Sequence, residues 1–167
     1  MVKKLFLVLL LVAPLSMFAQ DKLAYINADE VFYKMPEIKD VETKLATARE
    51  GIIKTKESME KEYQLTVEKY SKTPADSLTQ ALSQARLKEL QDMDERYQVY
   101  LQQSAQELEK QQQDLLAPLR DKFAKAVKEV GDENGYTYIM NVAIMLHIGS
   151  NAVDAGPKVK AKLGITN

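Results

Sequence analysis

The feature of this sequence that most restricts its fold is a pair of long helical patterns almost free of helix-breaking residues. Between Glu37 and Ser71, apolar or small residues recur every three or four positions, at Val41, Leu45, Ala48, Ile52, Met59, Tyr63, Val67 and Tyr70. A second pattern runs from about Pro74 to Val130, with neither glycine nor proline between Ala75 and Ala117. These patterns predict two long helices rather than a mixture of short elements.

The second pattern has only one apolar side. Its stripe consists of Leu78, Leu82, Ala85, Tyr97, Leu101, Leu108, Leu115, Leu119, Phe123, Val127 and Val130. Off this stripe, residues 91–113 are rich in glutamine and nearly devoid of apolar side chains. A helix that is polar on three sides packs along one seam and faces water elsewhere. At 1.5 Å per residue the two helices are about 50 Å and about 85 Å long, and a short connection makes them antiparallel.

The connection near residues 72–76 carries its own signals. Thr73 is expected to cap the second helix, Pro74 to occupy its first position, and Asp76 to complement its positive end. Pro118 lies inside the second pattern and is expected to kink the helix. We interpret Pro118 as a hinge at the shoulder, where the helical arm enters the rest of the protein.

The residues before the arm predict a strand and a short helix. Leu23–Ile26 is β-prone. Asn27 is expected to cap a helix, with Glu30 reaching back in a capping box. Pro36 disfavours helical geometry in the residue before it, so this helix should end near Met35.

The residues after the arm predict further strands and a closing helix. Gly131 and Gly135 are expected to end the long helix. Residues 136–141 alternate like a strand, residues 143–148 form a second apolar run that we expect to contain a strand residue at His147, and residues 154–163 predict a short helix opened by Pro157.

The predicted fold class is therefore mainly α with a small β body (α+β), in which a long antiparallel helical hairpin, a coiled-coil arm, projects from the body. Residues 20–36 and 118–167 form the body and shoulder, and residues 37–117 form the arm. Such a body has too few strands to be stable alone, so we expect it to oligomerise. The candidate contacts are Leu23, Tyr25, Ile26, Tyr138, Ile139 and Met140.

The first 19 residues predict a signal peptide. Lys3 and Lys4 precede an unbroken apolar run over residues 5–13, which is too short to span a bilayer. We expect cleavage between Ala19 and Gln20, and an exported protein that is soluble in the periplasm.

Composition excludes several kinds of function. The chain has no cysteine and one histidine, and we expect no metal site and no cofactor. Lys+Arg and Asp+Glu number 23 and 24, which argues against nucleic acid as a partner. The pattern Ser58–Lys61 matches the S-x-x-K motif of acylating serine enzymes, but its companion motifs are missing and it lies on a charged helix. We therefore expect that this protein is not an enzyme.

The order of parts resembles the OmpH family, the Skp-like periplasmic chaperones of diderm bacteria. The most specific residues are Leu115–Phe123, which contain Pro118, followed by Ala126 and Val127 and then by Gly135–Ile139. The resemblance implies a homotrimer whose bodies join and whose arms enclose a cavity. It implies an ATP-independent holdase that binds unfolded outer-membrane β-barrel proteins, in agreement with the absence of a GxxxxGK[ST] loop.

Two residue sets follow from this resemblance. Residues near the arm tip, Met59, Tyr63, Tyr70, Leu78 and Leu82, are interpreted mainly as closing the hairpin seam. Tyr97 and Tyr100 are three positions apart, so we do not expect both to point into a narrow seam with equal burial, and Tyr100 is preferred as a contact facing the cavity between the arms. The candidate client contacts are Met59, Tyr63, Tyr70, Tyr97 and Tyr100.

Charge distinguishes this chain from the basic members that the resemblance brings to mind. Without Lys3 and Lys4 the balance is 21 cationic against 24 acidic side chains. We find no basic cluster, so binding to lipid or lipopolysaccharide is not carried over, and client capture is expected to depend on apolar contact and confinement. A coiled-coil adaptor that spaces envelope components stays open as an alternative.

Overall fold

The structure is a computed structural model that describes residues 22–74 and 78–166. The expected signal peptide, its cleavage bond and Asp76 of the expected turn lie outside these residues. The elements in order are β1 (Leu23–Ile26), α2 (Ala28–Tyr33), α3 (Ile38–Ser71), α4 (Gln80–Asn134), β2 (Tyr138–Asn141), the 3₁₀ helix η2 (Val142–Ile144), β3 (Val153–Asp154) and α5 (Gly156–Lys162). The expected fold class, mainly α with a small β body, is confirmed.

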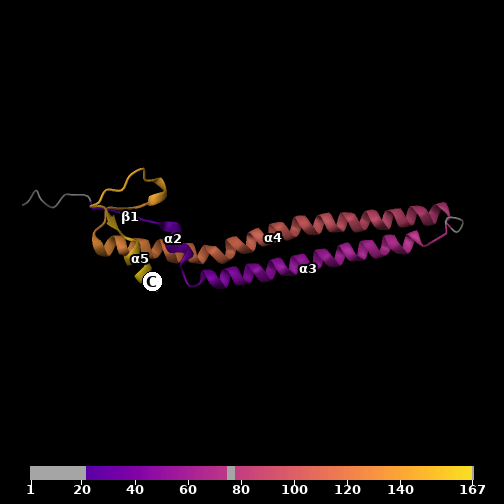
Figure 1. The fold of residues 1–167 in the computed structure, drawn as a ribbon, viewed down its shortest axis with the longest axis horizontal. Helices are drawn as coiled ribbons and strands as arrows, with labels where there is room; N and C mark the ends of the chain where they lie inside the picture. The colour runs from indigo at the N-terminus through magenta and orange to yellow at the C-terminus, as the bar shows by residue number, and fades with distance from the viewer. Residues whose placement is uncertain (1–21, 75–77, 167) are drawn as a thin grey trace, which may run out of the picture. The chain divides into compact units, whose positions relative to one another are not determined.

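The described residues form two compact units. The arm unit is Glu37–Leu119, and the body unit contains the residues up to Pro36 and those from Arg120 onward. Helix α4 continues through Pro118 and contributes to both units. Within the arm unit, α3 and α4 lie side by side and antiparallel (Figure 1).

The start of α4 differs from the expectation. The helix begins at Gln80 rather than Pro74, and Leu78 precedes it. The Thr79 hydroxyl accepts a hydrogen bond from the Leu82 amide at 3.2 Å, which is the bond of an N-cap. The Thr73 hydroxyl instead accepts one from the Arg86 guanidinium at 3.0 Å. Thr79, four residues before Ser83, also accepts the first backbone bond of the helix.

The end of α4 also differs, because the helix continues through Gly131 to Asn134. A Cβ at Gly131 would lie 3.7 Å from Ile139 Cδ1, which is an ordinary van der Waals contact, so packing does not require a glycine at this position. The helix ends at Gly135, whose φ of 64° is the left-handed conformation of a helix terminus. The Tyr136 amide donates to the Gly131 carbonyl at 3.0 Å and closes this terminus.

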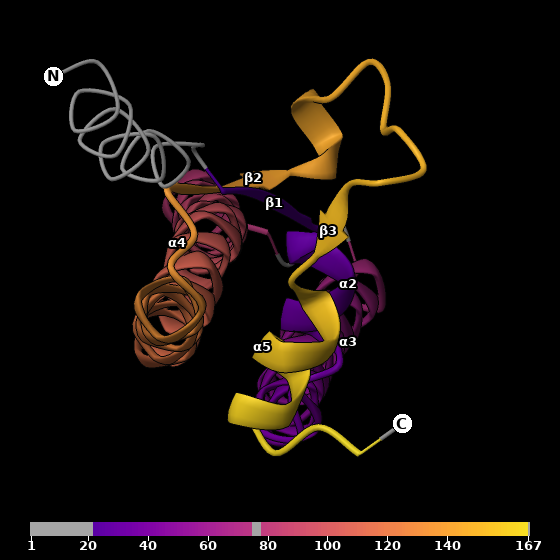
Figure 2. The ribbon, with the colours of Figure 1, turned by 90° about the vertical axis from the view of Figure 1, so that its left-hand side faces the viewer.

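The body unit is built on a small parallel sheet in the order β2-β1-β3 (Figure 2). Leu23 pairs with Tyr138 and Ile26 with Asn141, while Ala24 pairs with Val153 on the other side of β1. The buried side chains of this unit are Ala24, Ile26, Val31, Met35, Ala126, Val130, Ala155, Val159 and Leu163. Residues 24–35 and residues 126–163, which are far apart in the chain, therefore form one core around β1.

The expectation of a strand in residues 143–148 is wrong. The Asn141 side chain accepts hydrogen bonds from the Ala143 amide at 3.3 Å and the Ala28 amide at 3.4 Å, and the chain turns into η2 instead of extending. His147 is consequently an exposed residue of the irregular segment after η2, not a strand residue. The third strand is β3, after which Asp154 Oδ1 accepts from the Gly156 amide at 2.8 Å as α5 begins.

Only half of the expected capping box at α2 is formed. The Asn27 side chain accepts from the Glu30 amide at 3.1 Å, as predicted. The Glu30 carboxylate, however, lies 2.9 Å from Lys34 Nζ and 2.7 Å from Lys160 Nζ. The stronger attraction of two ammonium groups draws the carboxylate toward α5 rather than back to the cap.

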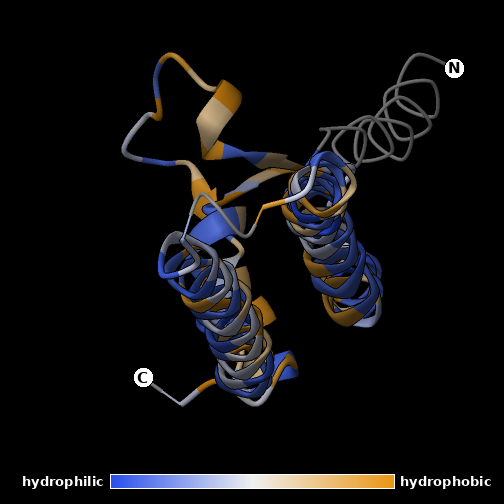
Figure 3. Cartoon of the chain, turned by 90° about the vertical axis from the view of Figure 1, so that its right-hand side faces the viewer, coloured by the Kyte–Doolittle hydropathy of each residue, from blue (hydrophilic) through white to orange (hydrophobic). Residues whose placement is uncertain are grey.

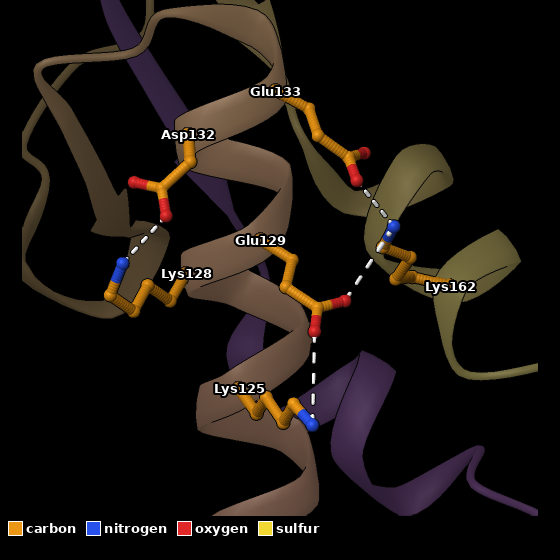
Figure 4. A network of polar contacts seen from close by, with 6 residues as sticks. All are labelled: Lys125, Lys128, Glu129, Asp132, Glu133 and Lys162. Carbon is orange, nitrogen blue, oxygen red and sulfur yellow. Dashed lines mark hydrogen bonds and ion pairs between the residues drawn. The ribbon is translucent and has the colours of Figure 1, made fainter.

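Helix α5 is fastened by lysines to both of its neighbours. Lys160 reaches Glu30 on α2, and Lys162 lies 2.5 Å from Glu133 and 3.5 Å from Glu129 on α4 (Figure 4). The apolar side of α5 contributes Val159 and Leu163 to the core. Apolar burial and ion pairs together therefore hold α5 on the body.

Two glycine substitutions are expected to change stability in opposite directions. Gly135→Ala places a side chain at positive φ and should destabilise the protein by about 1–2 kcal/mol. Gly51→Ala lies inside α3 in open space and should stabilise it by about 0.5–1 kcal/mol. Urea unfolding followed by circular dichroism measures both; an equal shift in the same direction would contradict the described helix terminus.

Acid is expected to weaken the attachment of α5. Hydrogen bonds from Lys160 and then Lys34 lower the pKa of the Glu30 carboxyl from 4.5 to about 2. A pKa that is lower in the folded state stabilises the protein above about pH 4.5, and this contribution is lost as the pH falls toward about 2. Glu30→Gln should therefore be less stable than the wild type at neutral pH, and the two should converge in strong acid.

Denaturant unfolding across this pH range measures the convergence. Lys160→Gln is the matched control, because it removes the first partner of Glu30 and should also flatten the acid dependence. Parallel stability curves for the wild type and Glu30→Gln would contradict the assigned ion pair.

Candidate functional site

The seam between α3 and α4 contains little fully buried apolar surface. In the described part of the arm unit, the buried side chains are Ile38, Val41 and Leu45 near the start of α3 and Met93 on α4. The remaining positions of the two predicted stripes in this unit are half-buried or exposed. The outer part of the arm therefore depends on other contacts for its pairing.

Three tyrosine hydroxyls supply cross-helix hydrogen bonds. Tyr97 on α4 donates to Glu60 Oε1 at 2.6 Å, and Tyr100 donates to the Ile52 carbonyl at 3.4 Å. Tyr70 on α3 donates to a Glu89 carboxylate oxygen on α4. The rings of Tyr97 and Tyr100 are both half-buried, and their long side chains let both hydroxyls reach α3.

These bonds shift the acidity of the phenols. The hydrogen bond to the Glu89 carboxylate raises the pKa of Tyr70, and the bond to Glu60 raises the pKa of Tyr97. Near the end of the arm, the Arg86 guanidinium lies 4.6 Å from the centroid of the Tyr70 ring. Polar and cation–π contacts thus join the helices where apolar burial is small.

A cavity of about 200 Å³ lies between the two helices in the middle of the arm. Met59 and Tyr63 line it from α3, and Met93 and Tyr97 line it from α4. The other lining residues are Glu60, Gln64 and Asp94. Thioether and phenol side chains form its walls, and two carboxylates lie among them.

Our sequence interpretation missed Met93 and the motif behind this cavity. Residues 59–63 read Met-Glu-Lys-Glu-Tyr and residues 93–97 read Met-Asp-Glu-Arg-Tyr. The shared pattern is methionine, an acidic residue, two further residues and tyrosine. Positions i and i+4 lie on one face of a helix, so each copy presents its methionine and tyrosine together. The recurrence of this pattern was the available signal.

The outer faces of the arm carry scattered apolar side chains in contact with solvent. Ile53, Leu65 and Leu87 are 54%, 55% and 58% exposed. The others are Tyr63, Val67, Leu82 and Val99. Tyr63 is the most exposed of the five candidate client contacts, whereas Met59, Tyr70, Tyr97 and Tyr100 are half-buried.

The body unit carries a second apolar surface. Tyr138 and Leu23 are exposed on paired strands, and the segment between β2 and β3 exposes Ile144, Leu146 and Ile148. Hydrophobic colour marks most of this segment in Figure 3. Among the other candidate oligomer contacts, Tyr25, Ile139 and Met140 are half-buried, while Ile26 is only 3% exposed and packs in the core.

The described residues contain no group of three or more His, Asp or Glu side chains placed to hold a metal ion. None of the helices in the described ranges is long and apolar enough to cross a membrane. What the arrangement offers chemically is surface: exposed apolar side chains, a small cavity and mixed charge.

Comparison with known proteins gives one family. The model described as outer membrane protein (OmpH-like) matches residues 22–163, which is nearly the whole described chain. No curated protein is significantly similar to this sequence. The matched range includes every element from β1 to α5. The chain therefore belongs to the OmpH family, whose members are periplasmic chaperones of outer-membrane proteins.

Proposed function

We propose that this protein is an ATP-independent holdase of the periplasm, which binds unfolded outer-membrane β-barrel proteins between the arms of an oligomer. Family membership supports the kind of client. The observation that carries the holdase mechanism is the exposure of apolar side chains along a hairpin that has few buried ones. A surface of this kind binds extended apolar segments without requiring a particular sequence.

The strength of such binding comes from the number of apolar contacts rather than from any single contact. Complete burial of a large apolar side chain contributes about 1.5–3 kcal/mol, and partial burial contributes less. The seven large apolar residues that are exposed in the described part of the arm are dispersed, so each forms a weak contact that breaks readily. Several arms acting on one client multiply these contacts by avidity and still allow release without nucleotide.

Among the candidate client contacts, Tyr63 is the first choice because it is 39% exposed. Met59 and Tyr97 contribute to client binding through the cavity between α3 and α4. Tyr70 and Tyr100 contribute through the exposed parts of their rings. The exposed residues Ile53, Leu65 and Leu87, which lay off our predicted stripe, are added to this set.

The oligomer is proposed to form through the body, as a trimer. Exposed Leu23 and Tyr138 and the apolar segment with Ile144 and Leu146 support this, because a surface of this kind favours association. Ile26 contributes indirectly, by holding β1 in the core. Pro118 is proposed as the hinge that lets arms admit clients of different size, and it lies one residue before the last residue of the arm unit.

Removal of the outer arm is expected to abolish client protection. The Tyr100 hydroxyl meets the Ile52 carbonyl, so replacing residues 50–100 by a short Gly/Ser turn shortens the hairpin at a level where the helices are paired. The variant should keep its oligomeric state. It should fail to suppress the aggregation of a urea-diluted outer-membrane barrel protein, which the wild type suppresses at about one trimer per client without nucleotide.

Light scattering follows aggregation, and native mass spectrometry follows oligomeric state. Ile53→Ser, Leu65→Ser and Leu87→Ser combined form the finer variant, since all three are exposed and the seam stays intact. Full protection by the shortened variant would contradict the arm mechanism and favour a coiled-coil adaptor.

A charge in the apolar segment of the body is expected to dissociate the oligomer. Leu146→Glu alters a fully exposed side chain, so the fold of the single subunit should stay unchanged. Burial of the new carboxylate at an interface would be unfavourable, and monomer should predominate in native mass spectrometry. Ser150→Glu, in the nearby turn, is the control. An intact oligomer for Leu146→Glu would show that this segment lies outside the interface.

A further inference from the structure

The cavity in the middle of the arm has the chemistry of a recognition site for a cationic side chain. It combines two methionine thioethers, two tyrosine rings and two carboxylates in one partly open cavity between α3 and α4. Its volume of about 200 Å³ far exceeds the roughly 15 Å³ that one water needs, yet it is below the roughly 300 Å³ at which pockets for small-molecule ligands begin. The size therefore suits one large side chain of a polypeptide.

The two walls of the cavity are related by the repeated motif. Met59 and Tyr63 on one helix face Tyr97 and Met93 on the antiparallel partner, so each end of the cavity has one thioether and one phenol. Methionine adapts its shape to the occupant, and a tyrosine face attracts a cation. Met93 is only 6% exposed and forms the floor.

The charge around the cavity favours a cation. Residues 57–64 and 90–97, which carry the cavity, contain six carboxylates and two cationic side chains. Glu60 accepts the Tyr97 hydroxyl and lies 3.6 Å from Lys56 Nζ. Asp94 has no ion pair or hydrogen bond with any other residue in the described ranges, and its charge is available to an occupant.

We propose that this cavity binds the side chain of an arginine in an unfolded client, with its methylenes against Met59 and Met93 and its guanidinium near Asp94 and Glu60. Arginine fits better than lysine because its planar, weakly hydrated head stacks on tyrosine rings and pairs with carboxylates. An apolar side chain of similar size would leave Asp94 without a partner, whereas Glu60 would keep Tyr97 and Lys56. The inference deepens the proposed holdase function and rests on it: arginines would add a polar anchor to the apolar contacts of the arm.

The test uses the full mature chain with ¹³C-labelled methionine methyl groups. The probe is a short acetylated and amidated Gly/Ser peptide with one central arginine, and its partner carries citrulline, which has nearly the same shape without the charge. The arginine peptide should shift the methyl signals of Met59 and Met93, with a dissociation constant of about 1 mM, while those of Met140 and Met145 in the body stay unchanged. The citrulline peptide should bind about fivefold more weakly.

The matched variants are Asp94→Asn in the cavity and Asp92→Asn outside it, which change charge equally on the same helix. Asp94→Asn should weaken arginine binding about fivefold, and Asp92→Asn less than about twofold. Circular dichroism of both variants checks that α4 is intact. Stationary signals of Met59 and Met93, equal binding of the two peptides, or equal effects of the two variants would each overturn the proposal.

Aggregation suppression by the unmodified chain separates this proposal from the function on which it rests. A wild type that protects a barrel protein but does not distinguish arginine from citrulline overturns the cavity assignment alone. A wild type that gives no protection overturns the holdase function, whatever the peptide titration shows.

Discussion

The parallel pairing of β1 with β2 is the constraint on which the rest of the structure depends. Residues 23–26 hydrogen-bond with residues 138–141, so everything between them must leave the sheet and return to it. A parallel pair always needs a long crossover connection. Here the crossover consists mainly of α3 and α4, and two long helices that begin and end at neighbouring strands can satisfy it by running antiparallel. The hairpin is thus a consequence of strand pairing as much as of helix propensity.

The way in which the hairpin is held together leaves apolar side chains exposed for the client binding that we propose. A seam filled with leucine and isoleucine would use its apolar side chains internally. In this arm the outer seam relies on Tyr70, Tyr97 and Tyr100, whose hydroxyls bond across the helices, and apolar residues such as Leu65 and Leu87 lie exposed. Exposed residues such as Tyr63, Leu65 and Leu87 therefore take no part in these cross-helix hydrogen bonds.

The sequence predicted the long helices and the first two strands. It did not predict features that depend on which of two nearby residues caps or ends a helix. The two helices, β1, β2 and the Asn27 cap follow from periodicity and cap chemistry, and they are present. The predicted start of α4 was wrong because Thr73 and Thr79 can both cap a helix. In the structure the Thr73 hydroxyl is bonded to Arg86, and Thr79 is the residue that caps α4. Gly131 reads as a stop signal, yet it stays helical, and the left-handed conformation that ends α4 falls at Gly135 instead.

The segment after β2 shows a similar limit of prediction from local sequence. Its apolar run suggests a strand, but a single asparagine side chain at position 141 turns the chain into η2. The cavity was missed for a different reason: Met93 was not assigned to the stripe, and the repeat it shares with Met59 becomes meaningful only when the antiparallel register places the two copies opposite each other. Long-range register is the information that local patterns lack.

Cross-linking of introduced cysteines tests the antiparallel register most directly, since the chain has no cysteine of its own. Cysteines replacing Tyr63 and Met93, which line one cavity, should be joined efficiently by a short bismaleimide within a single subunit. Cysteines at Tyr63 and Leu108 should not react together, because 15 residues of helix displace the second site by about 22 Å. Efficient joining of the second pair, or none of the first, would contradict the paired arm on which the proposed function is built.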